Sequence, residues 1–281
     1  MSISSNFIEL VEHLSDAIEI PLIESVFFPK KSRANHIKSR KDNFGAIKLA
    51  DGSIGIVFIA LSPGVREKGA EINTNEYYMT HPVELAKKFG SSDLFERTLG
   101  LGAINAISQF VFRKSNFQFD FTTDSLGLLQ LNNDDKIGMV GFFPPLVKQI
   151  ERKSIPLIVI EKKEHLVRKT ENWEVTLDSD RLKECNKVLI TSTTVLNNTI
   201  DDILMKCSEA EKISLIGPTA GFLPDPLFNR NVQVVGSTYI HNSKLFMELV
   251  SKNERWGPST KKYCIQKQNY GSYLSLIENL D

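Results

Sequence analysis

The chain has 281 residues, of which 41% are hydrophobic and 24% charged, enough for one large or two small domains with a buried core. Lys and Arg together number 34, as do Asp and Glu, and a net charge of zero disfavours a general nucleic-acid binder, which needs a basic surface. Apolar runs fall far short of the roughly 20 residues that span a bilayer, and no basic-then-apolar leader opens the chain, so we expect a cytoplasmic protein without nucleic-acid or membrane partners.

The first half of the chain predicts an α+β unit. Apolar residues at helical spacing indicate an amphipathic helix at its start, and the Asp51–Gly52 turn joins two strands that should pair antiparallel. The predicted elements are helices over 7–18, 82–89 and 94–113 and strands over 24–28, 44–50 and 53–61.

The helix over 94–113 carries a cap signature and many small residues. Asp93 should accept hydrogen bonds from the first-turn amides, and Glu96 should reach back to the amide of the cap residue. Glycine within a helix costs about 1 kcal/mol relative to alanine. Gly100 and Gly102 therefore predict that another backbone or a ligand comes very close to this helix.

A polar connection over 115–136 separates this half from a second one, and we predict an α+β domain over 1–130 and a Rossmann-like domain over 131–281. Beyond the boundary, short β-branched strands alternate with helices, which is typical of right-handed βαβ units and a parallel, doubly wound sheet. The predicted strands cover 137–141, 157–160, 187–191, 213–216 and 232–235, and the helices cover 144–153, 199–208 and 243–252. The expected fold class is α/β.

Four loops follow these strands, and in open parallel sheets ligands bind at the carboxyl ends of the strands. The first loop, over 138–145, has Gly141 for a tight turn and Pro144 for a helix start. Phe142 and Phe143 stand where a dinucleotide fingerprint needs small residues. They leave little room for a pyrophosphate, although one ring could stack on a planar group.

The second loop begins at Glu161, 20 residues after Gly141, where nucleotide-binding Rossmann domains place an acid that binds ribose hydroxyls. A solvated strand-end carboxylate explains the residue equally well. In the third loop, Asn197 or Asn198 should cap the next helix, and a surplus of hydroxyl and amide groups suits a carboxylate or a polar small molecule. The candidate ligand-binding residues of the third and fourth loops are Thr191, Thr193, Asn197, Thr199, Gly217, Pro218 and Thr219.

Two polar residues on the small-residue helix are further candidates. Arg97 and Asn105 lie on one face, and a buried Asn must find hydrogen-bond partners. Asn105 either bonds a neighbouring loop or presents its amide to a cleft between the domains.

Other features give weaker indications. The basic stretch Lys30, Lys31, Arg33, His36, Lys38, Arg40 and Lys41 is typical of a solvated loop, with an anion-binding flap as the alternative. Histidines and the three separated cysteines show no metal-ligand spacing and no disulfide pattern, and no nucleophile elbow or P-loop occurs.

The set of motifs resembles the heavy-metal-chelation domain family. The resemblance covers most of the chain, roughly residues 7–252. The matching residues are Glu96-Arg97-x-x-Gly100-x-x-x-x-Asn105-Ala106, the loop over 138–145, Ile160-Glu161, Thr191-x-Thr193-x-x-x-Asn197-x-Thr199 and Gly217-Pro218-Thr219. The resemblance implies an N-terminal domain similar to that of enolase, a Rossmann-like C-terminal domain and an active site between them.

Three hypotheses follow. The first is a cytoplasmic protein that binds a small polar or anionic ligand, a divalent metal or a metal chelate between its domains. There, Glu161 accepts hydrogen bonds or ligates the metal, Phe142 and Phe143 form an apolar wall, and Arg97 neutralises a carboxylate or holds Glu161. The residues that orient the ligand are Asn105, Thr191, Thr193, Asn197 and Thr219. The second is an enzyme that uses a nucleoside cofactor such as S-adenosylmethionine, and the third is a non-catalytic scaffold. The sequence leaves open whether the protein is an enzyme and whether it forms a homodimer.

Overall fold

The first half of the chain folds around a small antiparallel sheet. Its strands β1 (Ile23–Phe27), β2 (Phe44–Leu49) and β3 (Ile54–Phe58) pair in chain order in a computed structural model, which describes residues 1–29, 43–121, 124, 126, 128–252, 254–278 and 280. Gly52 has a φ of +92° in the turn between β2 and β3, a conformation that glycine adopts without strain. The predicted hairpin is confirmed.

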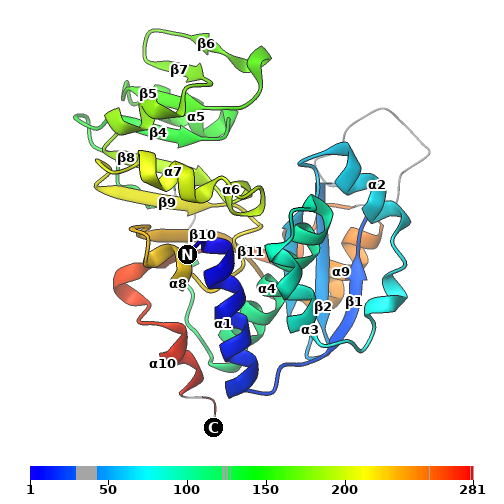
Figure 1. Cartoon of the computed structure of the whole chain (residues 1–281). Helices are drawn as coiled ribbons and strands as arrows, with labels where there is room; N and C mark the ends of the chain where they lie inside the picture. The colour runs from blue at the N-terminus through cyan, green and yellow to red at the C-terminus, as the bar shows by residue number, and fades with distance from the viewer. Residues whose placement is uncertain are drawn as a thin grey trace.

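Helices cover one face of this sheet (Figure 1). The helical elements of this half are α1 (Ile3–Ala17), α2 (Pro63–Glu71), η2 (Thr74–Tyr77), α3 (Pro82–Lys87), η3 (Lys88–Gly90) and α4 (Leu94–Lys114), of which α2 and η2 were not predicted. Asp93 caps α4 as expected, accepting from the amides of Phe95 and Glu96 at 2.8 and 3.0 Å. The expected bond from the Asp93 amide to Glu96 is wrong. The Asp93 amide donates to the Ser91 hydroxyl instead, and that hydroxyl donates to the Glu96 carboxylate at 2.6 Å.

The small residues of α4 admit another backbone, which is one of the two predicted alternatives. An ideal Cβ on Gly55 of β3 would lie 2.1 Å from the Gly102 carbonyl oxygen and 2.4 Å from the Ala106 nitrogen. On the other side of α4, a Cβ on Gly100 would lie 2.3 Å from the Phe89 nitrogen. The glycines therefore serve close packing of β3 and η3 on α4.

The second half forms an eight-stranded sheet in the order β11-β10-β9-β8-β4-β5-β7-β6 (Figure 1). Its strands are β4 (Ile137–Val140), β5 (Leu157–Ile160), β6 (Arg168–Lys169), β7 (Trp173–Thr176), β8 (Lys187–Thr191), β9 (Lys212–Ile216), β10 (Val234–Ile240) and β11 (Thr260–Gln266). Six of them are parallel, and the chain winds outward from β4 in one direction and from β8 in the other. This is the Rossmann strand order, with its switch point between β4 and β8. The predicted α/β fold class is confirmed.

Helical elements connect these strands. They are α5 (Pro144–Glu151), η4 (Glu164–Leu166), η5 (Ser179–Glu184), α6 (Thr193–Leu196), α7 (Ile200–Lys206), α8 (Asp225–Phe228), α9 (Ser243–Ser251), η6 (Gly257–Ser259), η7 (Lys267–Asn269) and α10 (Tyr273–Ile277). None of the helices in the described part of the chain is long and apolar enough to cross a bilayer.

The expectation of a purely parallel sheet needs correction at both edges. β6 pairs antiparallel with β7, and β11 pairs antiparallel with β10 along seven residues. A short turn rather than a long helix separates β6 from β7, so no helical period marked this region. β10 also runs to Ile240, five residues beyond the predicted strand end at Val235.

Both faces of the large sheet are buried, which explains its nearly continuous apolar strands. In β4, Ile137 and Met139 belong to one buried cluster and Val140 to the other. The second of these clusters continues into α1 and α4 of the first half. Phe246 of α9 packs on the face of the small sheet opposite α4, so an element of the second half covers a sheet of the first. The domain division at residue 130 stays a prediction.

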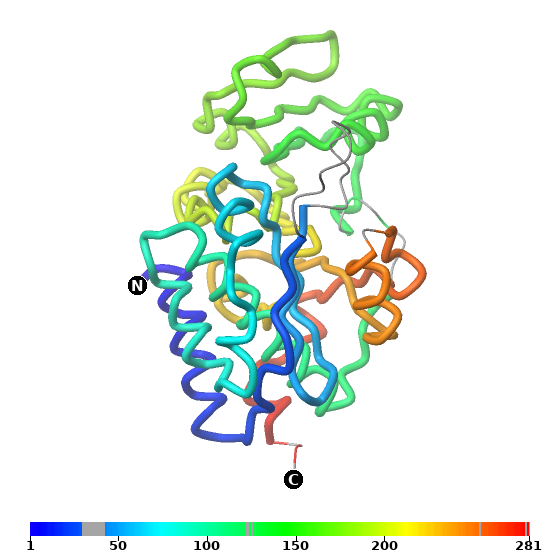
Figure 2. Tube along the Cα trace, turned by 90° about the vertical axis from the view of Figure 1, so that its right-hand side faces the viewer, coloured from blue at the N-terminus to red at the C-terminus, as the bar shows by residue number. Residues whose placement is uncertain are grey.

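The first and last helices of the chain lie near each other (Figures 1 and 2). The Tyr273 hydroxyl at the start of α10 lies 2.9 Å from Nδ1 of His13 in α1. The Tyr270 hydroxyl and the Tyr273 amide donate to the buried carboxyl of Asp225 at the start of α8, at 2.7 and 2.9 Å. Burial raises the pKa of Asp225 despite these bonds.

A buried ion pair joins the amino ends of β4 and β8. Asp135 accepts from Nζ of Lys187 at 2.8 Å and from the Asn186 amide at 2.9 Å. Burial opposes ionisation of the Asp135 carboxyl, but hydrogen bonds from the Asn132 amide, Lys187 and Asn186 outweigh it and lower its pKa.

We expect Asp135→Asn to destabilise the fold by about 1–3 kcal/mol near pH 7, because it weakens the charge-assisted bonds of a buried group. A carboxyl with a lowered folded-state pKa stabilises the protein above its unfolded pKa of about 3.9, and that contribution disappears as the pH falls through the folded value. Urea unfolding at several pH values should therefore show a constant difference between the two proteins above about pH 5 and a shrinking one below about pH 4. A difference that persists undiminished in acid would contradict the assignment.

Candidate functional site

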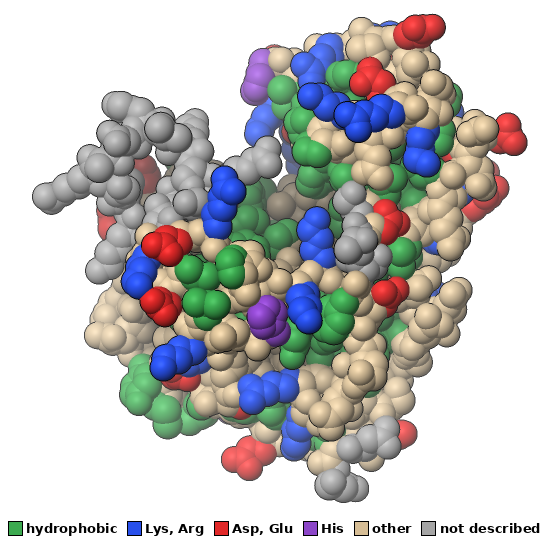
Figure 3. Space-filling view, turned by 180° about the vertical axis from the view of Figure 1, so that it is seen from behind, with side chains coloured by type: hydrophobic (Ala, Val, Ile, Leu, Met, Phe, Trp, Pro, Cys, Tyr) green, Lys and Arg blue, Asp and Glu red, His purple; other side chains and the backbone are tan. Residues whose placement is uncertain are grey.

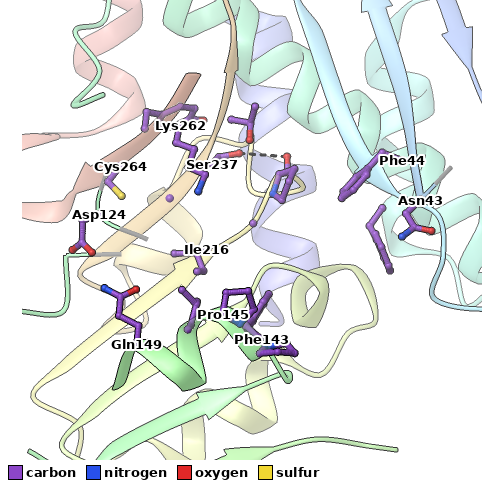
Figure 4. A pocket seen from close by; sticks show the side chains of 18 of the residues that line it. Asn43, Phe44, Asp124, Phe143, Pro145, Gln149, Ile216, Ser237, Lys262 and Cys264 are labelled. Atoms are coloured by element: carbon purple, nitrogen blue, oxygen red, sulfur yellow. Dashed lines mark hydrogen bonds between the residues drawn. The ribbon is translucent and has the colours of Figure 1, made fainter. Parts of the chain in front are cut away.

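A cavity of about 550 Å³ lies between the small sheet and the carboxyl edge of the large sheet. The space-filling view shows a hollow there, with hydrophobic side chains at its walls (Figure 3). In the close-up, Phe44 of β2 faces the turn that carries Phe143, while Lys262 and Cys264 come from β11 (Figure 4). The lining residues are Asn43, Phe44, Phe58, Asp124, Phe142, Phe143, Pro144, Pro145, Leu146, Gln149, Ile216, Gly217, Pro218, Gly236, Ser237, Thr238, Lys262, Tyr263 and Cys264.

The turn between β4 and α5 forms one wall of the cavity. Gly141 has a φ of +92°, and its amide donates to the Ile160 carbonyl. Phe142 donates its amide to Glu161, and Pro144 and Pro145 have no amide hydrogen. A turn that binds a pyrophosphate offers several free amides at a helix N-terminus. This turn offers aromatic rings instead, as the two phenylalanines predicted.

Glu161 lies beside this turn but does not line the cavity. Its carboxylate accepts from the Phe142 amide at 3.2 Å and from the Lys162 amide at 2.8 Å. Phe142 in turn lies under the guanidinium of Arg168, 4.8 Å from the ring centroid, and near Trp173. The arrangement makes Glu161 a residue that shapes the turn. Its predicted contact with a ligand stays untested.

The cavity has few charged side chains. Lys262 lies exposed at its rim, and no ion pair joins it to another described residue. Asp124 uses its carboxylate to accept from the amides of Leu126 and Leu128. Burial raises the pKa of the Cys264 thiol to about 12, so the thiol is protonated near neutral pH. Asn43 accepts from the Arg66 guanidinium of α2. The walls are therefore mainly apolar.

The hydroxyl and amide groups of the third loop bond one another. The Thr191 and Thr193 hydroxyls lie 3.0 Å apart, and Asn197 accepts from the amide and hydroxyl of Thr199. The two Asn197–Thr199 bonds lie in the turn before α7. The expectation that Asn197 or Asn198 caps α7 is wrong, because Thr199 is the cap residue and no described side chain bonds the first-turn amides. The Asn198 side chain bonds Ser4 of α1 instead. Part of the predicted surplus of polar groups is thus used within the protein.

The strand-end loops do meet at one edge, as predicted. A Cβ on Gly141 would lie 3.1 Å from Thr191, and a Cβ on Gly217 would lie 2.3 Å from the Ser192 hydroxyl. The hydroxyl of Thr219 is buried and accepts from the Phe58 amide at 3.0 Å. Thr219 thereby ties the fourth loop to the small sheet.

Asn105 follows the structural alternative. It is fully buried, and its amide nitrogen donates to the carbonyls of Ile56 and Thr219 at 2.8 and 2.9 Å. The expectation that it faces a cleft is wrong, because packing of β3 and the fourth loop on α4 encloses it. Its side-chain oxygen has no partner among the described residues.

Arg97 also has a structural role. The expectation that it neutralises a carboxylate or holds Glu161 is wrong, because its buried guanidinium donates to the carbonyls of Phe89 and Leu196 and to the Ser4 hydroxyl. Burial lowers its pKa. The guanidinium also lies over the Phe89 ring, 4.5 Å from the centroid.

Of the predicted ligand-binding residues, Phe142, Phe143, Gly217 and Pro218 line the cavity. The remaining nine do not line it: Arg97, Asn105, Gly141, Glu161, Thr191, Thr193, Asn197, Thr199 and Thr219. The basic stretch from Lys30 to Lys41 lies outside the described residues.

Sequence reasoning missed the cavity residues of the small sheet and of β11. Phe44 and Phe58 are register partners at the open end of the β2–β3 hairpin, which is a detectable signal once the hairpin is predicted. Lys262 and Ser237 gave no such signal, because β11 and the second half of β10 were not predicted.

The described residues do not form a site for a bare metal ion. They contain no group of three or more His, Cys, Asp or Glu side chains placed to hold one. Proteins usually supply three or four such ligands to zinc. Within the described lining of the cavity, only Cys264 and Asp124 carry side chains of these types.

The fold and the cavity define a class of α/β protein in which a Rossmann-type sheet and a smaller sheet enclose a ligand-sized cavity. The chain belongs to the DUF364 family, whose description reads "Putative heavy-metal chelation" and whose model matches residues 124–267.

Similar proteins match this chain over most of its length. The uncharacterized protein MJ0500 of Methanocaldococcus jannaschii is 28% identical over 259 residues, covering 84% of this chain and 96% of the relative. Two DUF364 crystal structures of proteins with unknown function share the fold with a TM-score of 0.65. The structure from Pyrococcus horikoshii is 21% identical, and the match covers 94% of this chain and 98% of that one. The one from Desulfitobacterium hafniense is 19% identical and covers 93% and 98%.

Proposed function

We propose that this protein binds a small organic ligand with a planar ring and an anionic group, such as a metal chelate, in the cavity between its two sheets. The observation that carries the proposal is the cavity lining. Phenylalanines from both halves, three prolines and a single lysine surround a space of about 550 Å³. This volume lies within the range of about 300–1,000 Å³ that is usual for small-molecule sites.

The lining favours a chelate over a free metal ion as cargo. Aromatic and proline side chains interact with flat apolar groups and not with a hydrated cation. A metal that enters as a chelate brings its own oxygen or nitrogen donors, so the protein needs only to hold the organic part. Lys262 at the rim would pair with a carboxylate of that part.

One observation keeps the nucleoside-cofactor hypothesis as the second candidate. Glu161 directly follows β5, the neighbour of β4, and in Rossmann enzymes an acid at this place binds ribose. Its carboxylate already accepts two backbone amides, which leaves part of its acceptor capacity for a ribose.

Thermal unfolding with four probes separates the candidates. Pyridine-2,6-dicarboxylate is a planar dianion that chelates divalent metals, so we would compare it alone, Ni²⁺ alone, their complex, and S-adenosylmethionine. A ligand at about 100 times its dissociation constant stabilises the folded state by about 2.7 kcal/mol. The complex or the free dianion should raise the melting temperature, and Ni²⁺ alone should not. A response to Ni²⁺ alone or to S-adenosylmethionine alone would overturn the proposal. Silence toward all four would exclude planar dianions as ligands.

Two variants test which residues hold the ligand. Phe143→Ala removes an aromatic wall, and Lys262→Gln removes the rim cation. We expect each to weaken binding of the dianion about 5- to 30-fold, in keeping with the 1–2 kcal/mol of one aromatic or charge-assisted contact. Calorimetric titration measures the dissociation constants.

Lys261→Gln is the matched control, because Lys261 is the exposed neighbour of Lys262 in β11 and does not line the cavity. It should leave the dissociation constant unchanged. Equal weakening by Lys261→Gln and Lys262→Gln would mean that general surface charge, and not the cavity, attracts the ligand.

A further inference from the structure

A second, smaller pocket lies between the two halves, at the other end of the β2–β3 hairpin. Its volume is about 240 Å³, below the usual size of a site for a drug-sized ligand. Its lining comes from the hairpin turn, the last turns of α4, the end of β10 and the first residue of α9: Gly52, Ser53, Ile54, Gln109, Arg113, Tyr239, Ile240, His241 and Ser243.

Most side chains around this pocket are polar, and several at its exposed rim have hydrogen-bonding groups that no other described residue uses. Arg113 donates through Nη1 to the carbonyl of Asp51, which leaves Nε and Nη2 without a partner among the described residues. No side-chain hydrogen bond within the described chain involves the His241 ring or the Ser243 hydroxyl. A guanidinium has five N–H donors in a fork that matches an oxyanion.

These donors converge. Arg113 Nη1 and the Ser243 hydroxyl lie 3.3 and 3.4 Å from the same point, the position of an ideal Cβ on Gly52. The absence of a side chain at Gly52 therefore leaves room between an arginine and a hydroxyl. The neighbouring carboxylate of Asp51 is engaged by the Ser53 amide and hydroxyl and faces Arg113 at 3.5 Å.

One buried group adds an acceptor. Gln109 is 8% exposed, and its amide nitrogen donates to the Gly221 carbonyl and the Tyr263 hydroxyl at 2.7 and 3.2 Å. Among the described residues, none donates a hydrogen bond to the side-chain oxygen of Gln109, and Gln109 lines the pocket. Gln109 also connects the two cavities, because Tyr263 lines the larger one.

We propose that this pocket is a second binding site, separate from the larger cavity, for a small oxyanion that carries a hydroxyl group. Arg113 and Ser243 hold the oxyanion, His241 adds a further donor, and the Gln109 oxygen accepts from the hydroxyl. Inorganic phosphate is the simplest member of this class and serves as the probe.

Calorimetric titration with phosphate at constant ionic strength, in Tris chloride, tests the site. We expect saturable binding that Arg113→Gln weakens about 10- to 100-fold, the effect of losing a charged hydrogen-bond donor. Lys114→Gln, a change of the adjacent cation in α4, should leave the affinity within about twofold, because Lys114 is exposed like Arg113 but does not line the pocket. Ser243→Ala should also weaken phosphate binding, and it tests the site independently if the Arg113→Gln protein does not fold.

Three results would overturn the proposal. They are no saturable heat with phosphate, equal weakening by Arg113→Gln and Lys114→Gln, and unchanged affinity in Ser243→Ala. Sulfate carries no hydroxyl near neutral pH, so it should bind more weakly than phosphate, and equal affinity would contradict the role of Gln109. None of these results depends on the ligand of the larger cavity.

Discussion

Replacing Gly55 with alanine is expected to lower the free energy of unfolding by about 3 kcal/mol or more, the upper end of the effects of overpacking. The added Cβ would lie 2.1 Å from the Gly102 carbonyl oxygen and 2.4 Å from the Ala106 nitrogen, and both are backbone atoms of α4. A helix backbone cannot rotate out of the way as a side chain can, so β3 and α4 would have to separate. Urea unfolding monitored by circular dichroism measures the loss.

Gly64→Ala is the control for this prediction. Gly64 lies near the start of α2, and a Cβ there would meet only the Ser62 hydroxyl at 3.9 Å. Alanine in a helix is favoured over glycine by about 0.5–1 kcal/mol, so this variant should be slightly more stable than the parent. A Gly55→Ala protein as stable as the parent would show that β3 and α4 are packed less closely than the structure has them.

The close packing of α4 was predictable from the sequence only in part. Gly100 and Gly102 indicated a close approach, because glycine is unfavourable within a helix. The partner could not be identified, since Gly55 is a single glycine in an apolar strand and resembles many such positions. The parallel strands were easier to predict, because burial of both sheet faces gives short, continuous apolar runs between turn residues.

Edge strands were missed for the opposite reason. In β11 the two lysines at 261 and 262 are exposed, so the strand shows neither the continuous apolar run of a central strand nor clear alternation. This omission removed Lys262 from the candidate site. The cavity depends on the packing of β10 and β11 against the small sheet, and a pattern along one segment does not report such long-range contacts.

Polar residues within apolar segments were the least predictable. Arg97 and Asn105 were placed at a ligand site because a polar group in a small-residue helix needs partners. The structure supplies those partners from backbone carbonyls of η3, α6, β3 and the loop after β9. The need for partners was correctly inferred, but sequence alone does not distinguish a ligand from a neighbouring carbonyl group.

Replacing Arg97 with methionine is expected to lower the free energy of unfolding by about 3–5 kcal/mol, because several buried acceptors would lose their donor at once. The guanidinium is 7% exposed and donates to Phe89 of η3, to Leu196 of α6 and to Ser4 of α1. These elements belong to both halves of the chain. Methionine has a similar apolar length but no donor, so the variant isolates the hydrogen bonds from the packing.

Arg97→Lys sharpens this test. Lysine keeps the positive charge but provides one compact ammonium in place of a planar fork, so it cannot reach Phe89, Leu196 and Ser4 together. If hydrogen bonding to these separate groups holds the halves together, Arg97→Lys should be nearly as unstable as Arg97→Met in urea unfolding. Full recovery of stability by lysine would show instead that the charge over the Phe89 ring, 4.5 Å from its centroid, is the dominant contribution. The two variants thus separate the geometric role of the guanidinium from its electrostatic one.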